Sequence, residues 1–380
     1  MYFNNLKNKI INNKVKIGII GLGYVGLPLS IKFTQKNISV VGFDIDKKLV
    51  STLNNGKFHL KTINKIFMNK KFKRNFSATN NFSKISNVDV IIICVPTPLK
   101  KDKKPDLSFL KKTIKNIKKY LVHGQLISLE STTYPGTTRE LIVNKINNKY
   151  KVGKDFFISF SPERENPGEN SILFNKITKI CAGYSKKCRE LSKNLYLKIS
   201  PVKTVSSLEA AEMTKLHENI YRTVNISLVN EMKMISEKFG LNINEIINAA
   251  KTKPFGFNAF YPGPGIGGHC IPVDPFYLVW AAKKRNVRTD FINLSARIND
   301  RISVWMLKII KKTLKTNKKS KKKILAVGLS YKKNVDDTRE SPSFKIIEQL
   351  LKANFTVKYY DPFFKRFPKQ RNYKFNEFII

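Results

Sequence analysis

The sequence of 380 residues predicts an α/β chain in three parts: a parallel sheet covered by helices, an all-helical segment, and a short return to strands. Three observations carry this prediction. Short apolar runs alternate with helical stretches in the first half, as in strand–helix–strand units. A long helical period then replaces them. An apolar run like the first returns after a lysine-rich stretch. We therefore expect a Rossmann-like domain at 1–203, a central helical domain at 204–316 and a partial Rossmann-like domain at 317–380.

The strands expected in the first domain are short apolar runs, separated by helical or polar stretches. They are predicted at 16–20, 38–43, 88–95, 126–129 and 156–160. Residues 1–15 contain no apolar core of the kind that a signal sequence has, so we expect only a polar lead-in to the first strand.

The central domain is expected to begin with a long helix. Ser206-Ser207-Leu208-Glu209 has the spacing of a capping box. Apolar residues then recur with a helical period as far as Phe239, and Gly240 is a natural stop. More helix is expected after the Gly- and Pro-rich segment 262–275, as far as about residue 314.

The C-terminal part is predicted to hold a strand at 324–329, a helix at 343–351 and a strand at 356–360. One such unit does not cover a sheet on both faces. We therefore expect an apparently truncated domain in which Val357, Tyr359 and Phe363 have few partners. Residues after about 318 should then be less stable than the rest.

Composition excludes several classes of protein. The formal net charge is +44, but the excess is nearly all lysine spread along the chain, which disfavours a nucleic-acid-binding protein. No apolar run approaches the roughly 20 residues that span a bilayer, so we expect no membrane partner and a cytoplasmic location. The four cysteines lack C-x-x-C spacing, so no metal site is expected.

The first strand runs into Gly21-Leu22-Gly23-Tyr24-Val25-Gly26, which opens a helix. The glycines allow a tight turn and the close approach of a pyrophosphate to the helix N-terminus. Asp44 ends the next strand and is placed to accept hydrogen bonds from a ribose diol, while it would repel a 2′-phosphate. The pattern predicts NAD, rather than NADP, as cofactor.

Polar loops follow three of the later strands. They are Cys94 to Pro98 with Thr97, Glu130 to Pro135 with Thr133, and Ser161-Pro162-Glu163-Arg164-Glu165. The carboxyl ends of parallel strands are where open α/β sheets hold ligands. Hydroxyl groups there would line the nicotinamide, and the last loop offers a carboxylate base and a cation. Ordinary turn residues remain the alternative at this stage.

The segment 263–275, GPGIGGHCIPVDP, is the most unusual stretch of the chain. Its glycines allow close approach to a ligand and leave Cys270 accessible. Core cysteines rarely lie in such a loop, so Cys270 is a candidate nucleophile. On the long helix, Lys215 and Asn219 share one face, followed by Arg222. They would bind an oxyanion, or else form a solvated face.

These motifs, together with 332–341 (KKNVDDTRES), occur in the order found in the UDP-glucose/GDP-mannose dehydrogenase family, which the chain resembles from about residue 16 to 362. The forms SPERENPGE and PGPGIGGHCIPVDPFYL are most similar to the UDP-N-acetylhexosamine branch. UDP-glucose dehydrogenases usually carry another residue at the position of His269 and lack the PGPG lead-in.

The resemblance implies an enzyme that oxidises the C6 alcohol of a UDP-N-acetylhexosamine, UDP-GlcNAc in particular, to the uronate with two NAD. Cys270 would hold the sugar as a thiohemiacetal and then as a thioester. Lys215 and Asn219 would stabilise the oxyanion, and Asp274 would orient water or Lys215. Glu163 would be the base for hydrolysis, and Thr133 would position water or nicotinamide.

The resemblance also implies binding positions and a homodimer built on the long helix. The cofactor-binding positions are Gly21, Gly23, Tyr24, Val25, Gly26, Asp44, Lys48, Thr97, Thr133 and Arg339. The substrate-binding positions are Glu163, Arg164, Glu165, Lys215, Asn219, Arg222, Tyr261, Gly267 and Lys332.

Several alternatives stay open on the sequence. UDP-glucose, UDP-ManNAc and UDP-GalNAc are alternative substrates, because the choice among epimers depends on the shape of the pocket, which the sequence does not determine. An inactive, truncated remnant with a binding role is a second class, and a basic nucleic-acid binder is a third. A hydrolase using Cys270 with His269 is disfavoured, because adjacent residues seldom point at each other.

Overall fold

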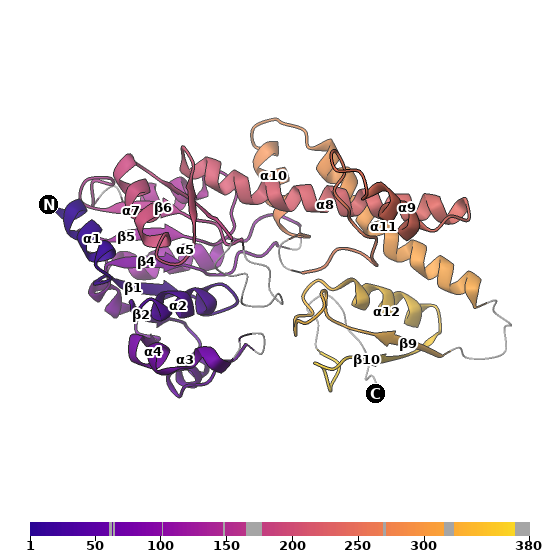
Figure 1. The fold of residues 1–380 in the computed structure, drawn as a ribbon, viewed down its shortest axis with the longest axis horizontal. Coiled ribbons are helices and arrows are strands. Elements are labelled where there is room, and N and C mark those ends of the chain that lie inside the picture. The colour runs from indigo at the N-terminus through magenta and orange to yellow at the C-terminus, as the bar shows by residue number, and fades with distance from the viewer. Residues whose placement is uncertain are drawn as a thin grey trace. The chain divides into compact units, whose positions relative to one another are not determined.

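The computed structural model describes residues 1–60, 63, 65–100, 102–146, 149–164, 177–268, 271–314 and 323–368. The chain divides into two compact units, Met1–His217 and Glu218–Ile380. Figure 1 labels many of the helices and strands of the two units, which are described one at a time.

The first unit contains an eight-stranded sheet of order β3-β2-β1-β4-β5-β6-β7-β8. Neighbouring strands are parallel except β6 and β7, which pair antiparallel. The reversal of strand order beside β1 is that of a doubly wound dinucleotide-binding sheet, so the Rossmann-like prediction is confirmed. The strands are β1 Lys16–Ile20, β2 Ser39–Phe43, β3 Phe76–Thr79, β4 Val90–Ile93, β5 Leu126–Leu129, β6 Phe157–Phe160, β7 Lys179–Gly183 and β8 Val202–Thr204.

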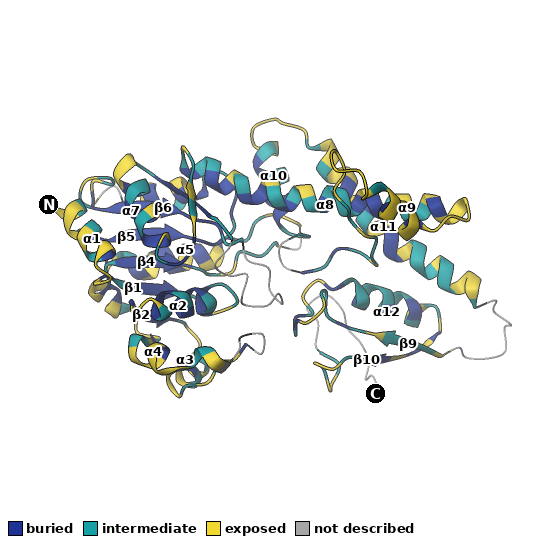
Figure 2. Ribbon diagram, in the orientation of Figure 1, coloured by how far each residue is buried: buried dark blue, intermediate teal, exposed yellow. Residues whose placement is uncertain are grey.

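Helices cover both faces of this sheet, and two hydrophobic clusters fill the space beneath them. One cluster takes residues from α1, α2 and α7, and the other from α5 and α6, so the central strands are buried on both sides (Figure 2). The helical elements are α1 Tyr2–Ile11, α2 Gly26–Gln35, α3 Lys47–Asn54, η1 Lys65–Phe67, α4 Lys70–Asn75, η2 Phe82–Asn87, α5 Ser108–Lys118, η3 Arg139–Val143, α6 Asn144–Ile146 and α7 Lys186–Tyr196.

Two expectations for this unit were wrong or incomplete. The N-terminal residues are not a polar lead-in, because α1 buries Leu6 and Ile10 and packs against α7. Its apolar residues Phe3, Leu6 and Ile10 recur at a helical spacing, a short pattern that the expectation of a polar lead-in overlooked. The expected strands also omitted β3, β7 and β8, which lie toward the two edges of the sheet.

The long helix α8 runs over Leu208–Lys238. Its first turn is capped by Ser207, whose Oγ accepts from the Ala210 amide at 3.1 Å, one residue later than the expected capping box. Gly240 has φ +71°, as expected for a helix stop. The helices that follow are α9 Ile243–Ala250, α10 Asp274–Lys283 and α11 Asp290–Thr313. Within the described ranges, no helix is long and apolar enough to cross a membrane.

The C-terminal part forms a parallel two-stranded sheet, β9 Lys323–Val327 and β10 Thr356–Tyr360, joined through α12 Pro342–Lys352. The expectation that Val357 and Tyr359 lack partners was wrong. Both are buried in a cluster with Phe344 and Leu350. The centroids of the Tyr359 and Phe367 rings are 5.2 Å apart. Phe363 is partly exposed, as are the side chains of Leu325, Val327 and Tyr360 on these strands.

Candidate functional site

The Gly-rich turn after β1 is shaped so that a ligand can approach its backbone. A Cβ on Gly26 would lie 1.9 Å from the Gly21 carbonyl oxygen, so packing of α2 against the turn requires glycine there. A Cβ on Gly23 would meet nothing within 4 Å. Packing therefore does not explain Gly23, whereas the close approach of a pyrophosphate does. The turn fits a dinucleotide.

Asp44 extends this turn from the end of β2. Its Oδ2 accepts a hydrogen bond from the Leu22 amide at 2.9 Å, and its Oδ1 accepts from the Asp46 amide at 3.1 Å. The carboxylate thus holds the Gly-rich turn as well as standing at the position expected for a ribose partner. Lys48 lies in the first turn of α3 and is exposed.

The loops that follow β4 and β5 are fastened to each other. The Thr97 hydroxyl donates to the Thr132 carbonyl at 2.8 Å, and the Ser131 hydroxyl donates to the Val95 carbonyl at 2.7 Å. Thr133 is buried, and its hydroxyl has no hydrogen-bond partner within the described part of the chain. A buried hydroxyl without a partner is uncommon, and it suits a residue that meets a ligand or water.

A cluster of buried charges lies where β5 and β6 end. Because β7 runs antiparallel to β6, its first residue, Lys179, reaches the carboxyl edge of the sheet. The Lys179 ammonium is 3.0 Å from Glu130 Oε2 and 3.6 Å from Glu163 Oε2. Glu163 also accepts from the Arg164 amide at 2.6 Å, and Arg164 donates to the Thr178 carbonyl.

The ionisation of this cluster follows from burial and from the two carboxylates. Burial lowers the pKa of Lys179, but Glu130 and Glu163 outweigh it and hold the pKa above its usual value. Burial lowers the pKa of Lys32, on α2, to about 8, and Glu163 opposes this shift. Burial and the nearby Glu130 raise the pKa of the Cys94 thiol. Lys179 is therefore charged at neutral pH and Cys94 is a neutral thiol.

A Lys179→Met variant is expected to lose about 3 to 5 kcal/mol of unfolding free energy, because Glu130 is left buried without its cation. The double variant Lys179→Met/Glu130→Gln should recover much of the loss, since the fully buried position 130 then carries no charge. Urea unfolding of the three proteins measures both effects. Equal stability of wild type and Lys179→Met would show that the buried pair contributes nothing.

The long helix carries a second group of predicted residues. Lys215 and Asn219 are one turn apart on α8 and are both buried. The Asn219 amide donates to Asp274 Oδ2 and its carbonyl accepts from Arg222. Asn219, Arg222 and Asp274 are thus brought together, with Asp274 in the first turn of α10.

The segment 263–268 is held to several elements of the second unit. The Gly263 amide donates to Asn230 of α8 at 2.9 Å, and the Ile266 amide donates to Asn299 of α11 at 2.7 Å. The Gly268 amide donates to the Arg339 carbonyl at 3.0 Å. A Cβ on Gly267 would lie 2.7 Å from Tyr331 Cβ. Glycine therefore allows this loop to lie directly against the segment that follows β9.

The remaining predicted positions are distributed as follows. The Arg339 guanidinium is paired with Asp337, with Nη2 2.6 Å from Oδ2. Lys332 follows Tyr331 in the same segment and is partly buried. The Tyr261 hydroxyl donates to Asn248 at 3.0 Å and is about half exposed. Glu165 and Cys270 lie outside the described residues.

Lys179 and Glu212 are among the charged residues of this region that the sequence did not single out. Lys179 begins a strand that had not been predicted, and Glu212 lies on α8 one turn before Lys215. The sequence signals for a functional role of these two residues are weak. Lys179 stands at the start of a short apolar run, and Glu212 lies among small apolar residues in a helix. Only the antiparallel turn of β7 and the packing of α8 give them partners.

Comparison with known proteins agrees with this arrangement. The UDP-glucose/GDP-mannose dehydrogenase family profiles match along the chain, the NAD binding domain at 15–200, the central domain at 209–301 and the UDP binding domain at 325–379. UDP-N-acetyl-D-mannosamine dehydrogenase of Methanocaldococcus jannaschii is 38% identical over 359 residues, 93% of this chain and 80% of that protein. UDP-N-acetyl-D-glucosamine 6-dehydrogenase of Pseudomonas aeruginosa is 34% identical, over 92% and 83% of the two chains.

The fold agrees with a solved structure as well. UDP-D-ManNAc dehydrogenase from Pyrococcus horikoshii superposes with a TM-score of 0.84 at 34% identity, covering 92% of this chain and 84% of that one. The dinucleotide turn, the buried face of α8 and the Gly-rich loop thus occur in a chain matched by all three domains of one family. This chain therefore belongs to the UDP-glucose/GDP-mannose dehydrogenase family of NAD-dependent UDP-sugar dehydrogenases.

Proposed function

We propose that this chain oxidises the C6 alcohol of a UDP-N-acetylhexosamine to the uronate, with Cys270 as the nucleophile. The observation that carries the proposal is the anchoring of the residues on both sides of 269–270. Gly268 bonds to Arg339, the Ile271 carbonyl accepts from Thr223 at 3.2 Å, and Asp274 accepts from Asn219. The flanks of Cys270 are therefore joined to the helix that carries the proposed oxyanion-binding residues.

The reaction converts an alcohol, one water and two NAD into a carboxylate, two NADH and three protons. Each of two NAD, bound in turn, would take up one hydride. The thiolate of Cys270 adds to the aldehyde, and the resulting thiohemiacetal is oxidised to a thioester that water cleaves. Lys215 and the second N–H of the Asn219 amide stabilise the oxyanion, because the first N–H is held by Asp274. Glu163 takes the proton of the attacking water.

The remaining predicted positions complete the proposal. Thr133 positions water or nicotinamide, while Thr97, Lys48 and Arg339 contact the cofactor. Arg164, Glu165, Arg222, Tyr261, Gly267 and Lys332 contact the UDP-sugar. We also propose domain boundaries at 1–203, 204–316 and 317–380, and the three matched family profiles lie within them.

The identity of the hexosamine is tested by measuring NADH formation with a panel of UDP-sugars. UDP-GlcNAc is the first candidate substrate and UDP-ManNAc is the second. Each is the substrate in the name of a relative that is similar to this chain. We expect two NADH and one uronate per sugar, with UDP-glucose and UDP-GalNAc much slower. Absence of turnover with every sugar in the panel would contradict the proposal.

The preference for NAD is expected to depend on the charge of Asp44. Asn can still accept the hydrogen bond from the Leu22 amide, so Asp44→Asn removes the charge while keeping the Gly-rich turn in place. For this variant, the kcat/KM for NAD divided by that for NADP should fall by about 10-fold. A change of about this size corresponds to the free energy of one charge-assisted hydrogen bond. Kinetics with both cofactors measure this, and an unchanged ratio would remove Asp44 from cofactor selection.

A homodimer is also part of the proposal. Several apolar residues of α8 are exposed in the single chain, among them Met213 at 40%, Leu228 at 53% and Ile235 at 45%, while Lys215, Asn219 and Asn230 are buried. An exposed apolar helix face of this kind marks an interface. The solution mass should be twice the chain mass of 43.7 kDa, and Leu228→Glu should halve it. An unchanged mass for Leu228→Glu would exclude this face.

A further inference from the structure

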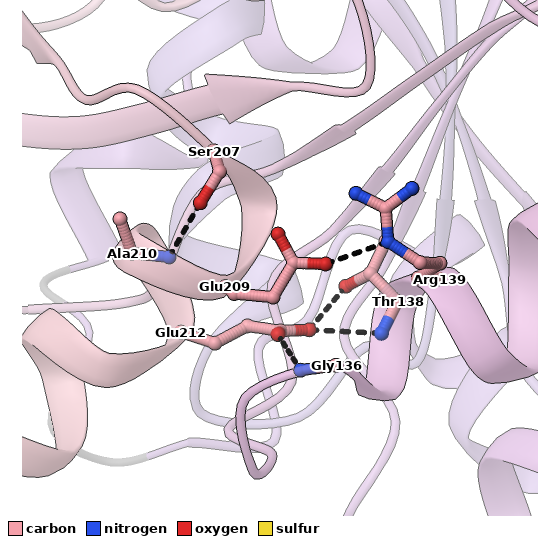
Figure 3. A network of polar contacts seen from close by, with 7 residues as sticks. All are labelled: Gly136, Thr138, Arg139, Ser207, Glu209, Ala210 and Glu212. Carbon is pink, nitrogen blue, oxygen red and sulfur yellow. Dashed lines mark hydrogen bonds and ion pairs between the residues drawn. The ribbon is translucent and has the colours of Figure 1, made fainter.

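Glu212, on the buried face of α8, accepts three hydrogen bonds from one loop (Figure 3). Its Oε2 accepts from the Gly136 amide at 2.5 Å. Its Oε1 accepts from the Thr138 amide at 2.8 Å and from the Thr138 hydroxyl at 2.6 Å. One carboxylate therefore fixes the end of the loop that leads from β5 to η3.

That loop carries Thr133, and its other end is fixed as well. Ser131 and Thr132 are bonded to the loop after β4, as described above. Between the two anchored ends, Thr133 is buried with its hydroxyl unpartnered among the described residues. The position of this hydroxyl thus depends on both anchors, and Glu212 is the anchor on α8.

Glu212 is also one turn before Lys215 on α8, so the two side chains share a helix face. Both residues are buried. The same carboxylate therefore connects the loop of Thr133 to the helical turn that carries Lys215. Any shift of Glu212 would change the relation of the loop to that turn.

The electrostatic surroundings make this contact depend on the charged form of Glu212. Burial raises the pKa of its carboxyl to about 7, while the Thr138 and Gly136 donors oppose the shift. Glu209 raises it further, although Glu209 is itself paired with Arg139 at 2.7 Å. Backbone amides only donate, so the full set of three bonds requires the carboxylate.

We propose that Glu212 is a positioning residue for the oxidation, holding the Thr133 loop in register with Lys215 on α8. The inference rests on the proposed function, in which Thr133 and Lys215 act on the bound sugar and cofactor. It assigns Glu212 no contact with either ligand.

The first test is amide hydrogen exchange at Gly136 and Thr138 in the full chain. Glu212→Gln is isosteric but keeps only one acceptor oxygen, so it is expected to speed the exchange of one of these two amides by about 10-fold, since a protein amide that loses its acceptor opens more readily. Glu209→Gln is the matched control, because Glu209 lies on the same helix as Glu212 and pairs with Arg139 of η3, but accepts no hydrogen bond from Gly136 or Thr138. Unchanged exchange in Glu212→Gln would overturn the inference, whether or not the protein turns over a sugar.

The second test is kinetic. Glu212→Gln should lower kcat by about 10- to 100-fold through misplacement of the loop, with little change in the KM for NAD, and Glu209→Gln should match the wild type. Glu212→Ala, which keeps no acceptor, should be slower than Glu212→Gln. In the double variant Thr133→Ala/Glu212→Gln, kcat should equal that of Thr133→Ala alone, because Glu212 acts through Thr133.

The outcomes separate this inference from the proposed function. Multiplicative losses in the double variant, or a wild-type kcat in Glu212→Gln, would overturn the positioning role. A wild type that oxidises no UDP-sugar would instead overturn the proposed function, while amide exchange would still report whether Glu212 holds the loop.

Discussion

Cys270→Ser is expected to form no uronate, with kcat lower by on the order of 10³-fold or more, while binding NAD as the wild type does. A serine hydroxyl is almost wholly protonated at neutral pH and is a far poorer nucleophile than a thiolate. The aldehyde formed by the first oxidation would then not be retained for the second. Uronate analysis and NAD titration of the same preparation measure both parts.

A matched control comes from a thiol in the core of the first unit. Cys181 is fully buried in β7, so Cys181→Ala removes a thiol far in sequence from the Gly-rich loop and should keep full uronate formation. Full turnover by Cys270→Ser would eliminate the covalent mechanism but leave membership of the family untouched.

Lys215→Met is expected to lower kcat by about 10²- to 10³-fold, with the KM for NAD nearly unchanged. Met has a similar length but no charge, so the variant loses a donor to the developing oxyanion in a buried site, where such a donor has its largest effect. Steady-state kinetics with saturating UDP-sugar measure the loss.

Lys238 supplies the control for this experiment, because it lies in the last turn of the same helix and is exposed. Lys238→Met changes the same charge on α8 and should leave kcat as it is. A loss of similar size in both variants would mean that net charge, and not oxyanion binding, is responsible.

Local patterns in the sequence determined much of the fold. The dinucleotide turn, Asp44 at the end of β2 and the helix stop at Gly240 follow from backbone geometry and short-range periodicity. The strands β1, β5 and β10 have the bounds expected from their apolar runs. Candidate catalytic residues were found for the same reason, since Lys215 and Asn219 are separated by one helical turn.

Other features depend on partners that are distant in the sequence, and only the tertiary structure decided them. Helix α1 buries Leu6 and Ile10 against the first unit, and the sequence of the helix does not show that its partner is α7. Val357 and Tyr359 are buried because Phe344 and Phe367 reach them.

The buried charges show the same division most clearly. A lysine and a glutamate read singly in a sequence are surface residues, because burying either one alone is costly. Lys179 is buried since the reversed direction of β7 brings it between Glu130 and Glu163. Glu212 is buried since the loop after β5 turns three donors toward α8. The sequence by itself determined the fold class, the dinucleotide turn and the candidate residues; the tertiary structure decided which charges are paired in the interior, because pairing requires the folded chain.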